Sequence, residues 1–339
     1  MKSITLITLI TVLVVVVLFS LGCISSPENK TEMVTHLRIG YQPTTHHVAE
    51  MIAQVKGWWQ EDLLPFGVTD IKEFGYPSGG SELEAMKAGD IDMAYICTAP
   101  FIRPVSTGLD AKIVVAVNTN GSTLILRPDL IYEGPQSLRG LHIGTFPVGT
   151  AQDTLLKVWL ENNGVGTSEV NITAMGPGDA VSAMLAGKVD GVFLPEPGPA
   201  MIELEKKGKS WVYSGEMKPN HACCAIVVSG KLIREEPELV EQIIRTHMNA
   251  TNYANAHPME AAEIYSNRTG QDLNMIKYSI NIWDGKWMSD PHILVNDTLE
   301  YAKSQYAMNY IQNMMGQSDL FDNSLYDKVM AVRGKDVIT

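Results

Sequence analysis

Cysteine is scarce in this chain of 339 residues, and the four cysteines that occur form no disulfide framework. One of them, Cys23, lies in the N-terminal segment, which leaves Cys97, Cys223 and Cys224. Adjacent cysteines rarely pair with each other because the geometry is strained, and none of the three is spaced as in a zinc site. We therefore expect a fold that is supported by its hydrophobic core alone.

Basic runs and low-complexity segments are also missing from the chain. The formal net charge is −12, which together with the lack of a basic run excludes nucleic acid and an anionic membrane face as partners. Hydrophobic residues at 45% and charged residues at 19% are ordinary for a globular protein, and the length suggests about two domains. Any anion that the protein binds must be held by local groups.

The N-terminus has the pattern of an export signal. A short basic head, Met1-Lys2, precedes an uncharged run over 3–22, and Cys23 follows. The segment resembles a lipoprotein signal, with 1–22 removed and Cys23 lipidated, although Ser20 stands where such signals usually carry an aliphatic residue. An uncleaved membrane anchor is the alternative, and it places the protein on the same, extracytoplasmic face of the cell membrane. Residues 23–35 then form a solvated tether.

One stretch of the sequence is repeated. Ser78–Pro100 and Gly176–Pro197 align without a gap, and the first strand segment, Leu37–Pro43, resembles Leu141–Pro147. The identical positions of the longer repeat are Ala85, Met86, Ala88, Gly89 and Asp92 in the first copy and Ala183, Met184, Ala186, Gly187 and Asp190 in the second. The repeat predicts two similar lobes with a cleft between them.

Strand, loop and helix follow one another as in a parallel α/β unit. An apolar strand over 37–41 precedes a helix over 46–56, and ligands of such folds lie at the carboxyl ends of the strands. We expect an α/β fold with a first lobe over 36–122, a second lobe over 123–222, and a completion of the first lobe over 223–339, which is helical in pattern.

Small residues precede two of the predicted helices. Ser78-Gly79-Gly80-Ser81 leads into the helix over 82–88, and Gly149-Thr150 opens a helix in the second lobe. Open amide hydrogens and the helix dipole attract an anion at such a start, whereas an ordinary Ser N-cap is the alternative. Two helix starts that converge on one cleft favour the anion site.

The motifs together resemble those of a known family, the substrate-binding proteins of ABC importers of the nitrate, sulfonate and taurine type. The resemblance covers about 37–316 and rests on these segments: Arg38–Gln42, Lys56–Trp59, Leu83–Asp92, Thr98–Pro100, Gly149-Thr150, Ala186–Gly191, Glu196-Pro197 and His257–Tyr265. It implies a two-lobed, periplasmic-binding-protein-like fold of type II, whose lobes are joined by two crossing segments. Such a protein closes on a small solute and passes it to the permease subunits of the importer.

The candidate ligand contacts fall at strand ends and helix starts on both sides of the cleft. They are Tyr41, Gln42, His46, Ser78, Gly79, Gly80, Ser81, Thr98, Phe146, Gly149, Thr150, Glu196 and His221. The expected solute is a small organic or inorganic anion: a sulfonate or aminosulfonate, nitrate or bicarbonate.

Glu196 is the candidate that fits an anion least well. A buried carboxylate repels a sulfonate or nitrate, so Glu196 either binds a hydrogen-donating part of the ligand or turns away to brace its loop. A pyrimidine-type thiamine precursor is therefore the alternative ligand. An enzyme on the same fold is a further alternative, but no nucleophile and base pair is evident, and we expect no enzymatic activity.

Two histidine and cysteine groups raise the question of a metal site. His46-His47 and His221 with Cys223 and Cys224 carry suitable ligand atoms, but the two groups are separated in sequence, and adjacent histidines on a helix point in different directions. We therefore expect no metal and no cofactor.

Overall fold

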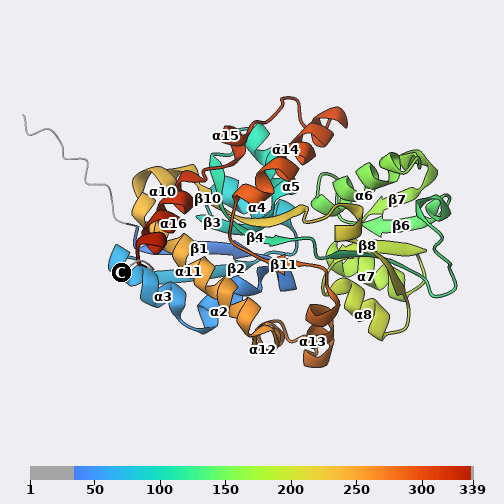
Figure 1. Cartoon of the computed structure of the whole chain (residues 1–339), viewed down its shortest axis with the longest axis horizontal. Coiled ribbons are helices and arrows are strands. Elements are labelled where there is room, and N and C mark those ends of the chain that lie inside the picture. Colours follow the sequence, from blue (N-terminus) through green and yellow to red (C-terminus); the bar gives the residue numbers. More distant parts are fainter. Residues whose placement is uncertain (1–33, 337–339) are drawn as a thin grey trace, which may run out of the picture. The chain divides into compact units, whose positions relative to one another are not determined.

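The computed structural model describes residues 34–336 and places them in helices and two β-sheets (Figure 1). The predicted signal over 1–22, the lipidation of Cys23 and the tether up to residue 33 lie outside the described residues. Among the helices that are described, none combines the length and the apolar character needed to cross a bilayer.

The larger sheet contains six strands in the order β11-β4-β10-β3-β1-β2. Strand β1 runs parallel to β2 and β3, whereas β10 is antiparallel to both β3 and β4. The strands are β1 (His36–Tyr41), β2 (Asp70–Gly75), β3 (Met93–Cys97), β4 (Ala111–Thr119), β10 (Ala222–Ser229) and β11 (Lys286–Trp287).

The smaller sheet contains five strands in the order β7-β6-β8-β5-β9. Strand β6 runs parallel to β7 and β8, and β5 is antiparallel to β8 and β9. The strands are β5 (Ser122–Leu126), β6 (His142–Thr145), β7 (Asn171–Ala174), β8 (Gly191–Pro195) and β9 (Lys209–Tyr213).

The two sheets share one topology apart from the short edge strand β11. Strand β3, from the first copy of the sequence repeat, lies beside β1, and β8, from the second copy, occupies the same position beside β6. In each sheet an antiparallel strand follows next, β10 in the larger and β5 in the smaller. The predicted α/β class is therefore confirmed.

Helices cover both faces of each sheet. In order they are η1 (Thr45–His47), α2 (Val48–Val55), α3 (Trp58–Leu63), η2 (Leu64–Phe66), α4 (Gly79–Ala88), α5 (Thr98–Ser106), η3 (Pro135–Leu138), α6 (Ala151–Asn162), η4 (Thr167–Glu169), α7 (Pro177–Leu185), α8 (Gly198–Leu204), α9 (Ser214–Met217), α10 (Gly230–Glu235), α11 (Pro237–Ala256), α12 (Pro258–Thr269), α13 (Leu273–Ile282), α14 (His292–Ala307), α15 (Gln317–Leu320) and α16 (Ser324–Asp336).

Hydrophobic clusters fix these layers. On one face of the larger sheet, α2 and α11 bury residues such as Met51, Ile52 and Ile243, and on the other face α5 and α14 bury residues such as Phe101 and Leu294 (Figure 1). Separate clusters lie on the two faces of the smaller sheet, under α6 and under α7 with α8. Burial of this apolar surface is the main stabilising contribution to the fold.

The repeated helix has well-defined ends. Helix α4 begins at Gly79 because the Ser78 hydroxyl accepts a hydrogen bond from the amide of Ser81, and it ends at Gly89. Gly89 has φ 79°, a left-handed conformation that glycine adopts without a steric penalty, and its amide donates to the carbonyls of Ala85 and Met86. The defined end of α4 fixes where in the sequence strand β3 begins.

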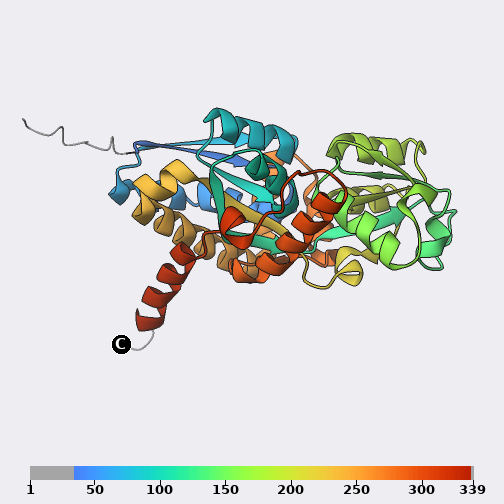
Figure 2. The same cartoon turned by 90° about the horizontal axis from the view of Figure 1, so that it is seen from above.

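The chain passes between the sheets at two places. Strand β4 ends at Thr119 and β5 begins at Ser122, and the return leads from α9 to the start of β10 at Ala222. The C-terminal part does more than complete the larger sheet, because the Tyr278 hydroxyl of α13 donates to Glu203 (2.9 Å), next to the end of α8. Helix α14 likewise lies beside α6 in both views (Figures 1 and 2).

Candidate functional site

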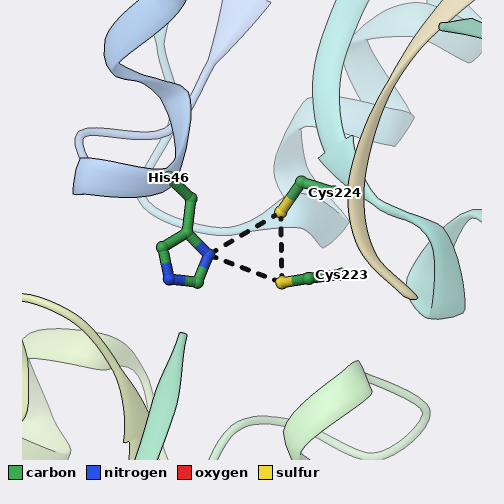
Figure 3. Close-up of side chains that lie close together, drawn as sticks. All are labelled: His46, Cys223 and Cys224. Atoms are coloured by element: carbon green, nitrogen blue, oxygen red, sulfur yellow. Dashed lines mark hydrogen bonds between the residues drawn. The ribbon is translucent and has the colours of Figure 1, made fainter. Parts of the chain in front are cut away.

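Three thiols and one imidazole meet near the ends of β1 and β3 and the start of β10. Figure 3 shows three of these side chains, His46, Cys223 and Cys224. Cys97 ends β3, Cys223 and Cys224 lie near the start of β10, and His46 lies in η1 after β1. His46 Nδ1 is 3.4 Å from the Cys223 sulfur and 4.0 Å from the Cys224 sulfur. The Cys97 sulfur is 2.9 Å from that of Cys224 and 3.9 Å from that of Cys223. These four side chains form what we call the thiol cluster.

The cluster corrects one step of the sequence analysis. The histidine and cysteine groups were expected to be separated, but His46 lies in contact with Cys223 because antiparallel β10 returns directly beside β3. Adjacent histidines do diverge as expected, since His47 Nδ1 instead accepts from the amide of Gln42 (3.1 Å).

The hydrogen bond at Nε2 determines the tautomer of His46. Nε2 lies 3.0 Å from the carbonyl oxygen of Gly121, which can only accept a hydrogen bond, so the proton of the neutral ring is on Nε2. Burial lowers the pKa of His46, which favours this neutral form. Nδ1 therefore presents a lone pair to the thiols.

The thiols differ in their surroundings. Cys223 and Cys224 are buried, whereas Cys97 is partly exposed. Burial raises the pKa of Cys224, whereas hydrogen bonds from the Cys224 and Cys97 thiols lower the pKa of Cys223. The amide of Cys224 donates to Asn118 Oδ1 (3.2 Å), which fixes the start of β10 against β4. Cys223 is thus the member of the cluster best prepared to act as a thiolate.

Unpaired polar atoms line the same edge of the larger sheet. Ala222 of β10 is in register with Thr119 of β4, and Thr98 follows the β3 residue that pairs with Cys224. Thr98 Oγ1, Thr119 Oγ1 and His221 Nε2 are buried and have no hydrogen-bond partner among the described residues. The two hydroxyls can donate, whereas His221 Nδ1 lies 3.1 Å from the carbonyl oxygen of Ala222 and carries the proton of the neutral ring, so its Nε2 is an acceptor. Such groups are costly to bury unless a ligand satisfies them.

The predicted contacts at the end of β1 are held by protein partners. Gln42 Nε2 donates to Glu82 Oε2 (2.8 Å), and the hydroxyl of Tyr41 accepts from Arg268 (3.2 Å). Glu82 is buried, its Oε1 has no partner among the described residues, and burial raises its pKa well above the ordinary range. Glu82 is thus a buried carboxyl with one unpaired oxygen beside Gln42, and the sequence analysis missed it.

The first predicted helix start is largely exposed. Ser78 caps α4 and its hydroxyl lies 3.3 Å from that of Ser81, while Gly79 and Gly80 begin the helix. Gly79 also lies against Ile96 and Gln42, so that a side chain at this position would collide with Ile96. The close approach explains the glycine without a ligand.

The second predicted helix start already holds an acidic side chain. Thr150 caps α6, and Asp153 of its first turn accepts from the amide of Gly149 (3.0 Å) and pairs with Lys157 (2.6 Å). The carbonyl oxygen of Gly149 accepts from Gln305 of α14 (3.1 Å). Phe146 packs against the hydrophobic cluster under α7 and α8.

Glu196 is turned toward α13. Its Oε2 accepts from the Ser279 hydroxyl (2.7 Å) and from the amide of Ala200 (3.3 Å), and its carbonyl oxygen accepts from the Thr44 hydroxyl (2.8 Å). Oε1 has no partner among the described residues, and burial raises the pKa of Glu196 to about 7. The side chain thus braces its loop while one oxygen stays unpaired.

Asp284 is a further residue that sequence reasoning missed. Its carboxylate accepts from the amide of Gly121 (2.9 Å) in one crossing segment and from the amide of Gly215 (2.6 Å) before the other. The preceding Trp283 lies over His46, with ring centroids 5.5 Å apart. No local pattern reveals these contacts, because Gly121 and Asp284 are 163 positions apart.

Gly121 is placed so that only glycine fits. It has φ 95°, and a Cβ at this position would lie 2.6 Å from His46 Nε2 and 3.1 Å from Trp283. We expect Gly121→Ala to lower the free energy of unfolding by about 3 kcal/mol, through backbone strain and the collision together. Urea denaturation measures the loss. Gly108→Ala is the matched control, because Gly108 has φ 98° with no atom near its missing Cβ, so it reports strain alone. Equal losses in the two variants would contradict a collision between the new methyl group and His46.

Comparisons with known proteins agree with the architecture. The nitrate-binding protein NrtA of Synechocystis PCC 6803 superposes with a TM-score of 0.76 at 16% identity, covering 88% of this chain and 89% of that one. The aliphatic sulphonate binding protein SsuA of Escherichia coli gives 0.74 at 15% identity, covering 85% and 92%. The fold is thus that of the periplasmic binding proteins, as expected. Residues 30–267 match the model of the NMT1-like family, and the chain belongs to this family.

Individual relatives match this chain at low sequence identity. A protein of Brucella abortus named as a binding protein is 28% identical over 221 residues, which cover 63% of this chain and only 65% of that protein's length. A Bacillus subtilis protein named for the binding of aliphatic sulfonates is 24% identical over 93% of this chain and 94% of its own. A 4-amino-5-hydroxymethyl-2-methylpyrimidine phosphate synthase of Saccharomyces cerevisiae is 24% identical over 73% of this chain and 75% of its own.

Proposed function

We propose that this protein is an extracytoplasmic solute-binding protein of an ABC importer, anchored at the cell membrane through Cys23. The observation that carries the proposal is the group of buried polar atoms at the edge of the larger sheet that have no partner among residues 34–336, which belong to Thr98, Thr119 and His221. This edge lies beside the segments that cross between the sheets, where binding proteins of this fold close on a solute. The fold and the relatives named as binding proteins support the proposal.

The proposed solute is a small organic or inorganic anion of the sulfonate, aminosulfonate, nitrate or bicarbonate type. The hydroxyls of Thr98 and Thr119 can donate to its oxygens, so a full ion pair is not required, whereas Nε2 of His221 can accept from the amino group of an aminosulfonate. The other proposed contacts come from the strand ends and helix starts predicted from the sequence, with Tyr41, Gln42, Ser78 and Thr150 among them. The permease subunits of the importer are the proposed protein partners, and the protein itself carries out no reaction.

A pyrimidine-type thiamine precursor is the second candidate, and one observation favours it. Glu82 and Glu196 each have a buried carboxyl oxygen without a partner among the described residues. A carboxyl oxygen of this kind accepts from the amino group of a pyrimidine, whereas it repels an anion when ionised. The relative from Saccharomyces cerevisiae supports this candidate and also keeps the enzymatic alternative open.

A panel of solutes measured by thermal denaturation tests the function. We expect one narrow class among sulfonates, aminosulfonates, nitrate, bicarbonate and pyrimidine precursors to stabilise the protein. At a hundred times the dissociation constant the stabilisation is about 2.7 kcal/mol, which raises the melting temperature by several degrees.

The same panel separates the alternatives. A flat response to every solute would contradict solute binding, and turnover of a stabilising solute by the purified protein would replace the binding function by an enzymatic one. Thr98→Val is the variant of choice, because it removes a buried hydroxyl without partners while keeping the volume of the side chain. It should weaken binding of the stabilising solute and leave the melting temperature of the free protein nearly unchanged.

A further inference from the structure

We infer that the thiol cluster holds a metal site, in which His46, Cys223 and Cys224 bind a zinc ion and the fourth position, on the side of Cys97, is left to water. The three named ligand atoms all lie within 4.8 Å of one another (Figure 3). This site does not depend on which solute the protein carries, so the two proposals can fail separately.

The distances match a tetrahedral ion at most edges. With Zn–S of about 2.3 Å and Zn–N of about 2.0 Å, a tetrahedron has sulfur–sulfur edges of about 3.8 Å and nitrogen–sulfur edges of about 3.5 Å. Among the three ligands, the edges are 3.6 Å between the sulfurs of Cys223 and Cys224, 3.4 Å from His46 to Cys223 and 4.0 Å from His46 to Cys224. Cys97 does not fit as a fourth ligand, because its sulfur lies only 2.9 Å from that of Cys224 and is not among the ligand atoms that lie within 4.8 Å of one another.

The imidazole is prepared for a metal in the way that ligand histidines usually are. The carbonyl of Gly121 accepts the Nε2 proton at 3.0 Å, which leaves the Nδ1 lone pair directed at the sulfurs. Trp283 lies against the ring, and the position of Gly121 permits no side chain between them. The orientation of the ligand is therefore set by the fold.

The charge of the complex also suits a buried position. His46, Cys223 and Cys224 are each at most 1% exposed, so a net charge here would be costly. Two thiolates balance the two charges of the zinc ion, and neutral imidazole adds none. Cys97, at the exposed side of the cluster, gives the ion a route of entry.

A disulfide between Cys97 and Cys224 is the competing interpretation of the cluster. The two residues are paired directly across β3 and β10, and their sulfurs are in contact. A disulfide would remove two of the three thiols and leave Cys223 and His46 alone. The experiment must therefore compare the two states of the sulfurs.

The test uses the full-length protein, reduced and freed of metal, with Zn²⁺ and Co²⁺ as probes. We expect one equivalent of Zn²⁺ to bind, and one equivalent of Co²⁺ to give the thiolate-to-metal charge-transfer band and the strong visible bands of a tetrahedral site. Cys223→Ser, Cys224→Ser and His46→Gln should each weaken Zn²⁺ binding by about 100-fold or more, because each removes a direct ligand, and loss of an outer-shell partner alone costs about 10- to 100-fold. Circular dichroism of each variant shows whether it is folded.

A control variant and two further measurements distinguish the metal site from a disulfide. His36→Gln is the matched control, because this histidine is exposed on β1 and pairs with Asp70, and it should leave Zn²⁺ binding unchanged. A Co²⁺ spectrum without the charge-transfer band would overturn the inference even if every variant failed to fold, since it is measured on the unaltered protein. So would a protein that binds no zinc after reduction and that re-forms a Cys97–Cys224 bond, seen as a loss of about two mass units.

Discussion

Replacing Asp284 by alanine is expected to lower the free energy of unfolding by about 3 kcal/mol, because one carboxylate holds both crossing segments. It accepts from the amides of Gly121 and Gly215 and from the hydroxyl of Ser214 (3.4 Å). Hydrogen bonds to a charged acceptor contribute more than neutral ones, and removing the acceptor leaves the donors without a partner. Urea denaturation measures the loss.

Hydrogen exchange localises this effect. The amides of Gly121 and Gly215 should exchange faster in Asp284→Ala, whereas amides inside β1 and β3 should keep their relative protection. Asp90→Ala is the control, because Asp90 is exposed and no hydrogen bond of its side chain is described, and its cost should stay below about 0.5 kcal/mol. If Asp284→Ala costs no more than the control, the carboxylate does not hold the crossing segments together.

The repeat and the order of strands and helices could be predicted from the sequence because they are local or periodic. Residues 82–88 were predicted as a helix, and α4 extends this range only to Gly79. Apolar spacing, capping serine and terminal glycine act within a few residues of one another. The fold class followed from these signals together with the family resemblance.

The thiol cluster could not be predicted, because it depends on register between distant strands. Cys97 and Cys224 are 127 positions apart, and only the antiparallel pairing of β10 with β3 brings them together. A shift of one residue in that register would turn Cys224 to the opposite face of the sheet. Hydrophobic patterns do not determine register in a strand as uniformly apolar as β10.

The direction of polar side chains also could not be predicted from the sequence. Thr150 was expected at an open helix start, and its neighbour Asp153 occupies the amide of Gly149 instead. Asp284 showed no signal, since its partners are backbone amides in two other segments. The sequence predicts which residues follow a strand, but the partners of their side chains depend on how the segments pack in three dimensions.

The stability of the protein should fall as the pH rises from about 5 to 8, to the extent that Glu196 contributes. Burial raises the pKa of this carboxyl from 4.5 to about 7, so the folded state binds the proton more tightly than the unfolded state. The stabilisation is complete below about pH 4.5 and is lost as the pH rises through 7. The difference between a pKa of 4.5 and one of about 7 corresponds to about 3 kcal/mol at high pH.

Glu196→Gln removes this dependence, because glutamine is never ionised and its oxygen can still accept from Ser279. We expect the variant to gain up to about 3 kcal/mol over the original protein at pH 8 and little or nothing at pH 5. The buried His47 and His247, whose pKa values lie at about 3 and about 4, act in the opposite direction, since they destabilise the fold as the pH falls below 6.5. Their contribution is the same in both proteins and cancels in the difference, so denaturation of the pair at the two pH values isolates Glu196.

Glu205→Gln, at an exposed position, is the control, and its free energy of unfolding should stay within about 0.5 kcal/mol of that of the original protein at both pH values. A Glu196→Gln variant with the same relative stability at both pH values would mean that the carboxyl is ionised and satisfied in the fold, for which its unpaired Oε1 would need a donor from a bound solute.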